Sequence, residues 1–252
     1  MKESRQEIIK EMFRTKGEVK LRELEERFPQ CSSMTLRRDI ISLEEQGLVK
    51  RTRGGAVAMS KIMIVTEDVY HKRASINTEK KLEIAKKAAA LFTQGCSIFI
   101  DAGSTMMFFE RELPDEYCSI LTTGVNVALE LMKKKNPIVT IVGGQLNKSS
   151  FAVTGINTGN MLDDMNIDVA FLASTGCTFD SGFTCGTYTD CELKRRMVHK
   201  ARRTIILMDS TKLGKNMPFT FANIDEVDVV VSDSQIPRDV VRQFESRGIT
   251  VL

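Results

Sequence analysis

The chain has 252 residues, of which 42% are hydrophobic, and its formal net charge at pH 7 is +3. This length suits two domains with a sizeable core and excludes a disordered chain at this hydrophobic content. No apolar run approaches the roughly 20 residues of a transmembrane helix, and the charged first residues are unlike a signal peptide. We therefore expect a soluble cytoplasmic protein with no membrane partner.

The excess positive charge lies entirely in the first sixty residues. Residues 1–60 hold 13 Lys and Arg against 10 Asp and Glu, whereas residues 61–252 hold 23 of each. This distribution fits a small phosphate-contacting module attached to a neutral body.

Two helices are predicted before residue 30. The first covers residues 3–15, with Ile8, Ile9, Met12 and Phe13 as its apolar stripe. The second is short: it carries Val19, Leu21, Leu24 and Phe28, and Pro29 ends it.

A third helix is predicted over residues 32–46. Leu36, Ile40 and Leu43 form one apolar face, Ser32 or Ser33 can cap the amino end, and Gly47 can end the helix in the left-handed conformation. Three short helices with a tight turn between the last two make a helix-turn-helix, in which the third is the recognition helix.

A basic hairpin follows, because β-prone segments flank Arg53-Gly54-Gly55. A hairpin beside a helix-turn-helix is a wing that can reach phosphates or the minor groove. We expect the DNA contacts to come from the helix start and the wing: Ser33, Met34, Thr35, Arg37, Arg38, Lys50, Arg51 and Arg53. The alternative is an ordinary amphipathic helix beside solvated surface charges.

Residues 59–77 read as a linker that can be partly helical, and an α/β layered domain follows over 78–252. A helix starts at Glu79 and ends before Gly95, and its buried face includes Leu82, Ile84 and Ala85. Strands and helices then alternate, as expected for a buried parallel sheet. Strands are predicted over 97–100, 120–122, 138–142, 168–172, 204–208, 227–231 and 249–252. Helices are predicted over 106–113, 127–134, 157–165, 190–200 and 237–246, and a long loop over 174–187.

Glycines and small hydroxyl residues recur directly after these strands, where ligands of such sheets bind. The amino end of the helix after Asp101-Ala102-Gly103-Ser104-Thr105 favours a phosphate. The expected pocket for a phosphorylated sugar or polyol comprises Asp101, Gly103, Ser104, Thr105, Thr122, Thr123, Asn126, Gly143, Gly144, Gly176, Lys194 and Lys212. Alternatively, the glycines serve sheet geometry, Asp101 caps a helix, and Lys194 belongs to a solvated helix face.

The sequence predicts no cofactor, metal or catalytic residue. It contains neither a Walker A loop nor a Gly-x-Gly-x-x-Gly loop. None of the six cysteines is in a Cys-x-x-Cys pair, and the two histidines, His71 and His199, lie far from any cysteine cluster. No spacing marks Asp168, Asp190 and Glu192 as an acid/base pair.

The chain resembles the DeoR family of transcriptional regulators almost end to end. The most specific stretch is Ser32-x-x-Thr35-Leu36-Arg37-Arg38-Asp39-Ile40, followed by Leu43-x-x-x-Gly47 and by Arg53-Gly54-Gly55-Ala56. In the second domain the similar stretches are Asp101-x-Gly103-Ser104-Thr105, Thr123-x-x-Asn126, Gly143-Gly144, Lys194-Arg195 and Asp209-Ser210-x-Lys212. One loop departs from the family: Ala173-Ser174-Thr175-Gly176 stands where many members have Gly-Ala-Asp-Gly, which leaves a different effector open.

The resemblance implies a winged helix-turn-helix followed by an α/β domain similar in fold to ribose-5-phosphate isomerase, glucosamine-6-phosphate deaminase and the CoA transferases. It also implies a sugar-phosphate sensor without turnover, and a homo-oligomer, dimer or tetramer, on operator DNA.

These observations predict a repressor of sugar-metabolism genes. Residues 1–58 bind double-stranded operator DNA, with the helix-turn-helix over about 20–46 and the wing over 48–58. Residues 78–252 bind the effector and oligomerise. The alternatives are a phosphosugar isomerase with an accessory DNA-binding head and a constitutive DNA binder without sequence preference.

Overall fold

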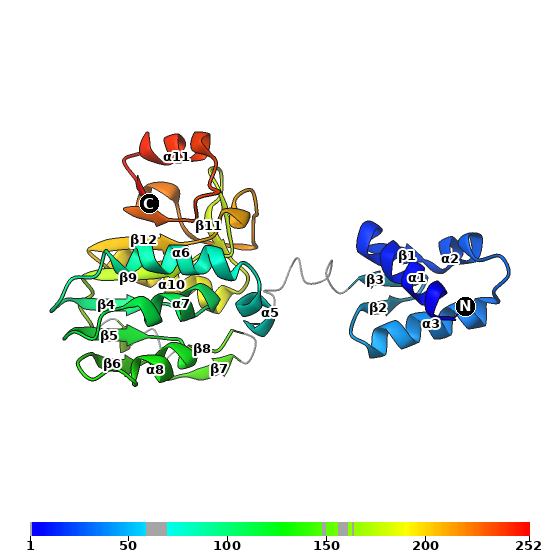
Figure 1. The fold of residues 1–252 in the computed structure, drawn as a ribbon, viewed down its shortest axis with the longest axis horizontal. Helices are drawn as coiled ribbons and strands as arrows, with labels where there is room; N and C mark the ends of the chain where they lie inside the picture. The colour runs from blue at the N-terminus through cyan, green and yellow to red at the C-terminus, as the bar shows by residue number, and fades with distance from the viewer. Residues whose placement is uncertain (1, 59–69, 148–149, 156–160, 163) are drawn as a thin grey trace. The chain divides into compact units, whose positions relative to one another are not determined.

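The computed structural model describes residues 2–58, 70–147, 150–155, 161–162 and 164–252 (Figure 1). The chain divides into two compact units, Met1–Thr66 and Glu67–Leu252.

The first unit contains helices α1 (Lys2–Lys16), α2 (Leu21–Arg27) and α3 (Ser33–Glu45). Its strands β1 (Glu18–Lys20), β2 (Val49–Thr52) and β3 (Gly55–Ala58) form an antiparallel sheet in the order β1-β3-β2. The expected helix-turn-helix and wing are therefore present. The expected start of the second helix at Val19 is wrong, because Val19 pairs with Ala56 in the sheet and α2 begins at Leu21.

Helix α3 has the expected ends and the expected apolar face. The Ser32 hydroxyl accepts a hydrogen bond from the Thr35 backbone N–H at 3.2 Å, and Gly47 lies at φ +70°. Leu36, Ile40 and Leu43 are buried against side chains of α1 and α2. Asp39 is also buried, and Arg5 of α1 binds its two carboxyl oxygens at 2.7 and 3.1 Å, so the recognition helix is tied to α1.

The second unit is built on seven parallel strands in the described part of the chain, ordered β15-β14-β12-β9-β4-β5-β6. These are β4 (Ser97–Ile100), β5 (Ser119–Thr122), β6 (Ile138–Ile141), β9 (Val169–Ala173), β12 (Arg203–Leu207), β14 (Val229–Val231) and β15 (Thr250–Val251). Each overlaps a predicted strand. The order reverses between β4 and β9. From β4, the chain adds β5 and β6 on one side of the sheet, and it then adds β9, β12, β14 and β15 on the other side.

Side chains alternate between the two faces of this sheet, and each face has its own core. Ile98, Ile100 and Phe171 pack on one side with α6 (Thr78–Ala89), α7 (Ser104–Glu112) and α8 (Val125–Leu131). Phe99 and Leu172 pack on the other with α10 (Tyr188–Lys200) and α11 (Arg238–Glu245). One side chain expected in the core of α6 is not there: Leu82 is 39% exposed.

Several short elements were not predicted. The expected loop over 174–187 contains β10 (Gly176–Thr178) and β11 (Gly182–Cys185), which form an antiparallel sheet with β13 (Phe219–Ala222). Strands β7 (Gln145–Asn147) and β8 (Ala152–Thr154) form a hairpin, and η1 (Ser210–Lys212) and η2 (Ile224–Glu226) are single 3₁₀ turns. Helix α5 (Tyr70–Ser75) lies within the expected linker. The helix predicted over 157–165 falls largely on residues outside the description.

Candidate functional site

The recognition helix and the wing line one groove in the first unit. Met34, Arg37, Arg38, Ile40 and Ile41 of α3 face Arg51, Thr52, Arg53, Gly54 and Gly55 of the hairpin, and Leu21 completes the wall. Arg37 and Arg38 are exposed and Met34 is 63% exposed, so the amino-terminal half of α3 presents long side chains to solvent. This is the surface that a recognition helix offers to the major groove.

Two of the predicted DNA-contacting hydroxyls also hold the motif together. The Ser33 hydroxyl donates to a carboxyl oxygen of Glu25 on α2, and the Thr35 hydroxyl lies 2.9 Å from that of Ser32. The Ser33–Glu25 bond links α3 to α2, whereas the Ser32–Thr35 contact lies within the amino end of α3. Ser33 and Thr35 therefore position the start of α3 whether or not they touch DNA.

The wing cations differ in their surroundings. Arg51 folds back onto Glu44 of α3. The Glu44 carboxylate accepts hydrogen bonds from the Arg51 backbone N–H at 3.0 Å and from the Arg51 guanidinium. These bonds lower the pKa of Glu44. Lys50 and Arg53 are exposed, so their charges remain available at the surface.

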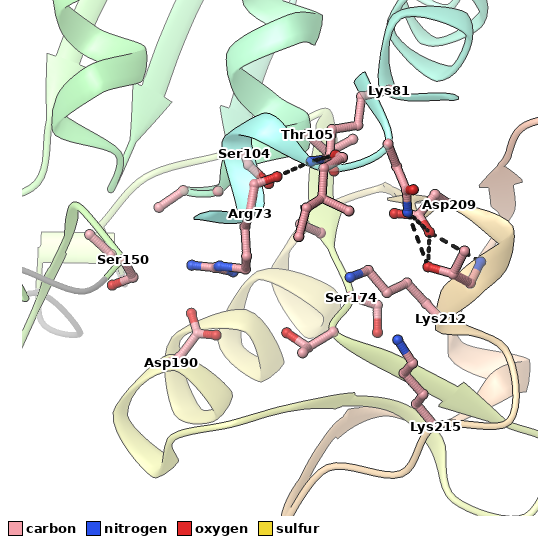
Figure 2. Close-up of a pocket in the computed structure, with 18 of the residues that line it drawn as sticks. Arg73, Lys81, Ser104, Thr105, Ser150, Ser174, Asp190, Asp209, Lys212 and Lys215 are labelled. Carbon is pink, nitrogen blue, oxygen red and sulfur yellow. Dashed lines mark hydrogen bonds between the residues drawn. The ribbon is translucent and has the colours of Figure 1, made fainter. Parts of the chain in front are cut away.

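In the second unit a pocket opens at the carboxyl ends of β4 and β9, where the strand order reverses (Figure 2). Such a switch point is the usual ligand site of a parallel α/β sheet, because the loops on its two sides leave in opposite directions. Five of the predicted effector residues line it, namely Gly103, Ser104, Thr105, Lys194 and Lys212.

The amino end of α7 forms one wall of this pocket. Gly103 caps the helix at φ +143°, a conformation that favours glycine, and no side chain caps the first turn. The backbone N–H groups of the first turn then have no intrahelical acceptor. Ser104 and Thr105 add two nearly buried hydroxyls at the same place. This arrangement suits an oxyanion.

Asp101 does not line the pocket but lies beneath it, fully buried. Its carboxylate accepts hydrogen bonds from the backbone N–H groups of Ala102 at 2.8 Å and Ala173 at 2.9 Å, and so joins the ends of β4 and β9. Lys194 Nζ lies 2.7 Å from Asp101 Oδ2 and also donates to the Ala173 carbonyl at 2.7 Å. Asp190 lies 3.4 Å from the same nitrogen.

Six further predicted residues lie outside the pocket wall. The Thr122 hydroxyl accepts from Gly124 N–H at 3.0 Å, and the Thr123 carbonyl accepts from Val153 N–H at 2.7 Å. Asn126 is on α8, and Gly143 and Gly144 follow the edge strand β6. An added Cβ at Gly176 would lie 2.5 Å from the Lys215 carbonyl oxygen, so this glycine permits close packing.

The pocket also contains polar residues that the sequence did not assign to it. They include Arg73, Asn77, Lys81, Ser150, Ser174, Thr175, Asp190, Asp209, Thr211 and Lys215. Asp209 lies in one of the stretches that resemble the family, and that resemblance was the only indication in the sequence that it belongs to the site. Arg73 and Asn77 gave none, because they lie in the segment interpreted as a linker.

Asp209 is 1% exposed and only partly hydrogen-bonded. Its Oδ1 accepts from Thr211 N–H at 3.1 Å and from Asn77 Nδ2 at 3.3 Å. Its Oδ2 is buried and has no hydrogen-bond partner among the described residues. A buried carboxylate oxygen in this state is suited to accept a ligand hydroxyl.

Lys81 is 3% exposed and anchors the chain before α6. Its ammonium donates to the backbone carbonyls of Arg73 and Ile76. Burial is the main cause that lowers its pKa to about 8. Lys81 is therefore a structural clamp whose ammonium is already engaged.

The described residues contain no group of three or more His, Cys, Asp and Glu side chains that could hold a metal ion. None of their helices is both long and apolar enough to cross a membrane.

Comparison with known proteins matches both units to one family. Residues 5–62 match the DeoR-like helix-turn-helix domain, and residues 76–234 match the DeoR C terminal sensor domain. The HTH-type transcriptional regulator GlpR of Haloferax volcanii is 31% identical over 222 residues, which cover 88% of this chain and 86% of that protein. The glycerol-3-phosphate regulon repressor of Escherichia coli K12 is 30% identical over 242 residues, 96% of this chain and 94% of that protein. The transcriptional repressor GlcR of Bacillus subtilis is 30% identical over 223 residues, 88% and 85% of the two chains.

Solved structures resemble part of the chain more distantly. Ribose 5-phosphate isomerase A of Methanocaldococcus jannaschii aligns with a TM-score of 0.41 and 21% identity over 55% of this chain and 56% of its own. The beta subunit of eIF2B from Chaetomium thermophilum aligns with a TM-score of 0.45 and 10% identity over 61% and 48%.

Proposed function

The chain belongs to the DeoR family of transcriptional regulators, and we propose that it represses sugar-metabolism genes until a small phosphorylated sugar or polyol binds its sensor domain. The relatives that cover most of the chain are named as regulators and repressors, and an isomerase with an accessory DNA-binding head is not favoured.

For the DNA-binding half, the proposal assigns base and phosphate contacts to the groove between α3 and the wing. Arg37 and Arg38 enter the major groove with Met34, while Lys50 and Arg53 reach the backbone. Ser33, Thr35 and Arg51 are assigned to the same surface, and their bonds to Glu25, Ser32 and Glu44 orient it.

For the sensor half, the observation that carries the proposal is the pocket between β4 and β9. Its wall combines the uncapped amino end of α7 with five basic and two acidic side chains among the described residues: Arg73, Lys81, Lys194, Lys212 and Lys215 against Asp190 and Asp209. A dianionic phosphate fits the positive surplus, and hydroxyl groups fit Asp209, Ser174 and Thr175. The E. coli relative is named for the glycerol-3-phosphate regulon, and glycerol 3-phosphate is a polyol phosphate.

We also propose that the protein acts as a dimer or tetramer, since helix-turn-helix repressors read paired half-sites. Four large apolar side chains are exposed on the edge strand β6 and on the helix α8 with its C-cap residue: Ile138, Ile141, Leu129 and Met132. We propose that a second copy of this chain covers this apolar surface, because a symmetric operator is bound by a symmetric dimer. Light scattering of the purified protein should give at least twice the monomer mass, and Leu129→Glu/Met132→Glu should lower it. A monomer at micromolar concentration would refute the oligomer.

The function is tested with the full chain and the DNA upstream of its own gene cluster. Fluorescence anisotropy should show sequence-specific binding, and one compound in a panel of phosphorylated sugars and polyols should release the DNA at millimolar concentration or below. Its unphosphorylated form should not release the DNA. Binding without sequence preference, or no release by any compound of the panel, would overturn the proposal.

A further inference from the structure

We infer that Arg73 is the main ligand of the effector's anionic group, and that its position on α5 carries the state of the pocket toward the DNA-binding unit. This inference rests on the proposed function. It names the residue that binds the anionic group and the segment that links the pocket to the DNA-binding unit. Arg73 belongs to the segment that the sequence presented as a linker, and the structure makes it part of the pocket wall.

The first observation is the state of the guanidinium. Nε and Nη2 of Arg73 are buried, and neither has a hydrogen-bond partner among the described residues. A guanidinium stays charged at any physiological pH and carries five N–H donors in a planar fork. Burying such donors without acceptors is costly. An oxyanion that offers two oxygens in one plane satisfies them together.

The other buried cations of the pocket are already engaged. Lys194 is paired with Asp101 at 2.7 Å, and Lys81 donates to two backbone carbonyls. Neither needs a ligand to satisfy its charge. Arg73 is partly buried, and among these three cations it is the one whose buried donors have no acceptor among the described residues.

The surroundings of Arg73 place the anion. Figure 2 draws Arg73 and Asp190 on one side of the pocket, Lys212 and Lys215 on the other, and Ser104 and Thr105 above Arg73. Ser104 and Thr105 are the first residues of α7. Asp190 already has Lys194 as an ionic partner at 3.4 Å. A phosphate between Arg73 and the α7 amino end would receive guanidinium and backbone N–H donors at once.

The second observation is how α5 is attached. Lys81 of α6 holds the carbonyls of Arg73 and Ile76, and Asn77, at φ 55°, links α5 to α6. The Asn77 amide donates at 3.3 Å to Asp209 Oδ1 and to the Thr211 hydroxyl, and both residues line the pocket. The α5–α6 junction is therefore bonded to Lys81 of α6 and to Asp209 and Thr211 in the pocket wall.

This junction lies next to the DNA-binding unit in the chain. The wing strand β3 ends at Ala58, and α5, which begins at Tyr70, is the first described element after it. An effector that binds Arg73 favours the conformations in which α5 is docked as seen here. Because ligands shift populations only through such differential contacts, Arg73 couples pocket occupancy to the connection between the units.

The test uses the full-length protein and the variants Arg73→Gln and Arg73→Lys, with Arg202→Gln, an exposed arginine of the same unit, as the matched control. Inorganic phosphate and the releasing compound of the panel above serve as probes. Calorimetry gives their affinities, operator anisotropy gives DNA release, and the melting temperature without ligand reports folding.

Arg73→Gln should bind both probes at least tenfold more weakly, still bind the operator specifically without ligand, and resist release. Arg73→Lys should be intermediate, because it keeps the charge but loses the fork. Wild-type affinity for both probes in Arg73→Gln would overturn the inference while the proposed function stands. Weakened binding with normal release at saturating ligand would overturn the coupling. Failure of the wild type itself to respond would refute the proposed function instead.

The route is tested separately by Asn77→Gly, which keeps the left-handed backbone but removes the amide that binds Asp209 and Thr211. We expect near-normal phosphate binding, since Arg73 is intact, with release requiring severalfold more ligand. An unchanged release curve would show that the α5–α6 junction does not carry the signal.

Discussion

Lys194 Nζ lies 2.7 Å from Asp101 Oδ2, and the two side chains are only 4% and 1% exposed. The pair connects α10 to the ends of β4 and β9, because Asp101 also accepts the Ala173 N–H and Lys194 donates to the Ala173 carbonyl. The sequence presented both residues as effector ligands. Asp101 lies beneath the pocket and Lys194 lines it, and we propose that the pair forms a floor that holds the other ligand-facing residues in place.

The first prediction concerns this pair. Lys194→Met removes the cation and leaves the buried carboxylate of Asp101 uncompensated, so the free energy of unfolding should fall by about 3–5 kcal/mol. Urea denaturation followed by circular dichroism measures the loss. The double variant Asp101→Asn/Lys194→Met should recover part of it, since no buried charge is then left alone.

The matched control is Lys212→Met, because Lys212 is less buried than Lys194. It should stay within about 1 kcal/mol of the wild type, as expected for a partly exposed lysine. An equally small effect of Lys194→Met would contradict a structural role for the pair and return Lys194 to the ligand contacts.

The second prediction concerns the recognition helix. Arg37→Ala should weaken operator binding by about 1–3 kcal/mol if the arginine contacts a base, with loss of discrimination against unrelated DNA. Arg14→Ala, which removes an exposed arginine of α1, should leave operator affinity nearly unchanged. Anisotropy titrations at several salt concentrations check both, and equal effects of the two variants would contradict a specific contact.

Local signals explain why the DNA-binding unit could be predicted. The Ser32 cap, the spacing of Leu36, Ile40 and Leu43, and Gly47 all lie within one helix and its ends. The strand at Val19 could not be predicted in this way, because it exists through pairing with Ala56, far along the chain.

The sensor site was predicted in part for a topological reason. Loops after β4 and β9 meet because these strands are neighbours at the reversal of strand order. Gly143 and Gly144 follow β6, two strands from β4 at about 4.8 Å per strand, and so lie beyond the pocket. Arg73 was missed because α5 has only six residues and docks through backbone carbonyls held by Lys81, which leaves no periodic apolar signal.

The third prediction concerns pH. Both carboxyl oxygens of Glu110 on α7 are buried without hydrogen-bond partners among the described residues. Burial, aided by Glu130, raises its pKa to about 9 from 4.5. The unfolded chain therefore loses this proton first as pH rises. Stability from this group is complete below about pH 4.5 and declines by about 1.4 kcal/mol per pH unit toward pH 9.

Glu110→Gln removes that titration. Its free energy of unfolding, measured in urea between about pH 6 and pH 8, should fall less steeply with pH than that of the wild type. Glu116→Gln, at an exposed position, should keep the wild-type slope. Identical slopes in all three proteins would show that Glu110 is ionised in the folded state.

The fourth prediction separates the two ends of the effector. Asp209 Oδ2 is the buried acceptor proposed for a hydroxyl group, whereas Arg73 and the α7 amino end are proposed for the phosphate. Asp209→Asn keeps the side-chain shape and an oxygen for the Thr211 N–H, but it turns a donor toward the ligand hydroxyl. Affinity for the releasing phosphorylated compound should fall by about 1–3 kcal/mol, while affinity for inorganic phosphate should be unchanged or slightly higher. Asp225→Asn, which alters an exposed carboxylate paired with Arg247 at 3.5 Å, is the control and should affect neither ligand. An equal loss for both ligands would mean that Asp209 shapes the whole pocket, and no loss for either would remove it from the site.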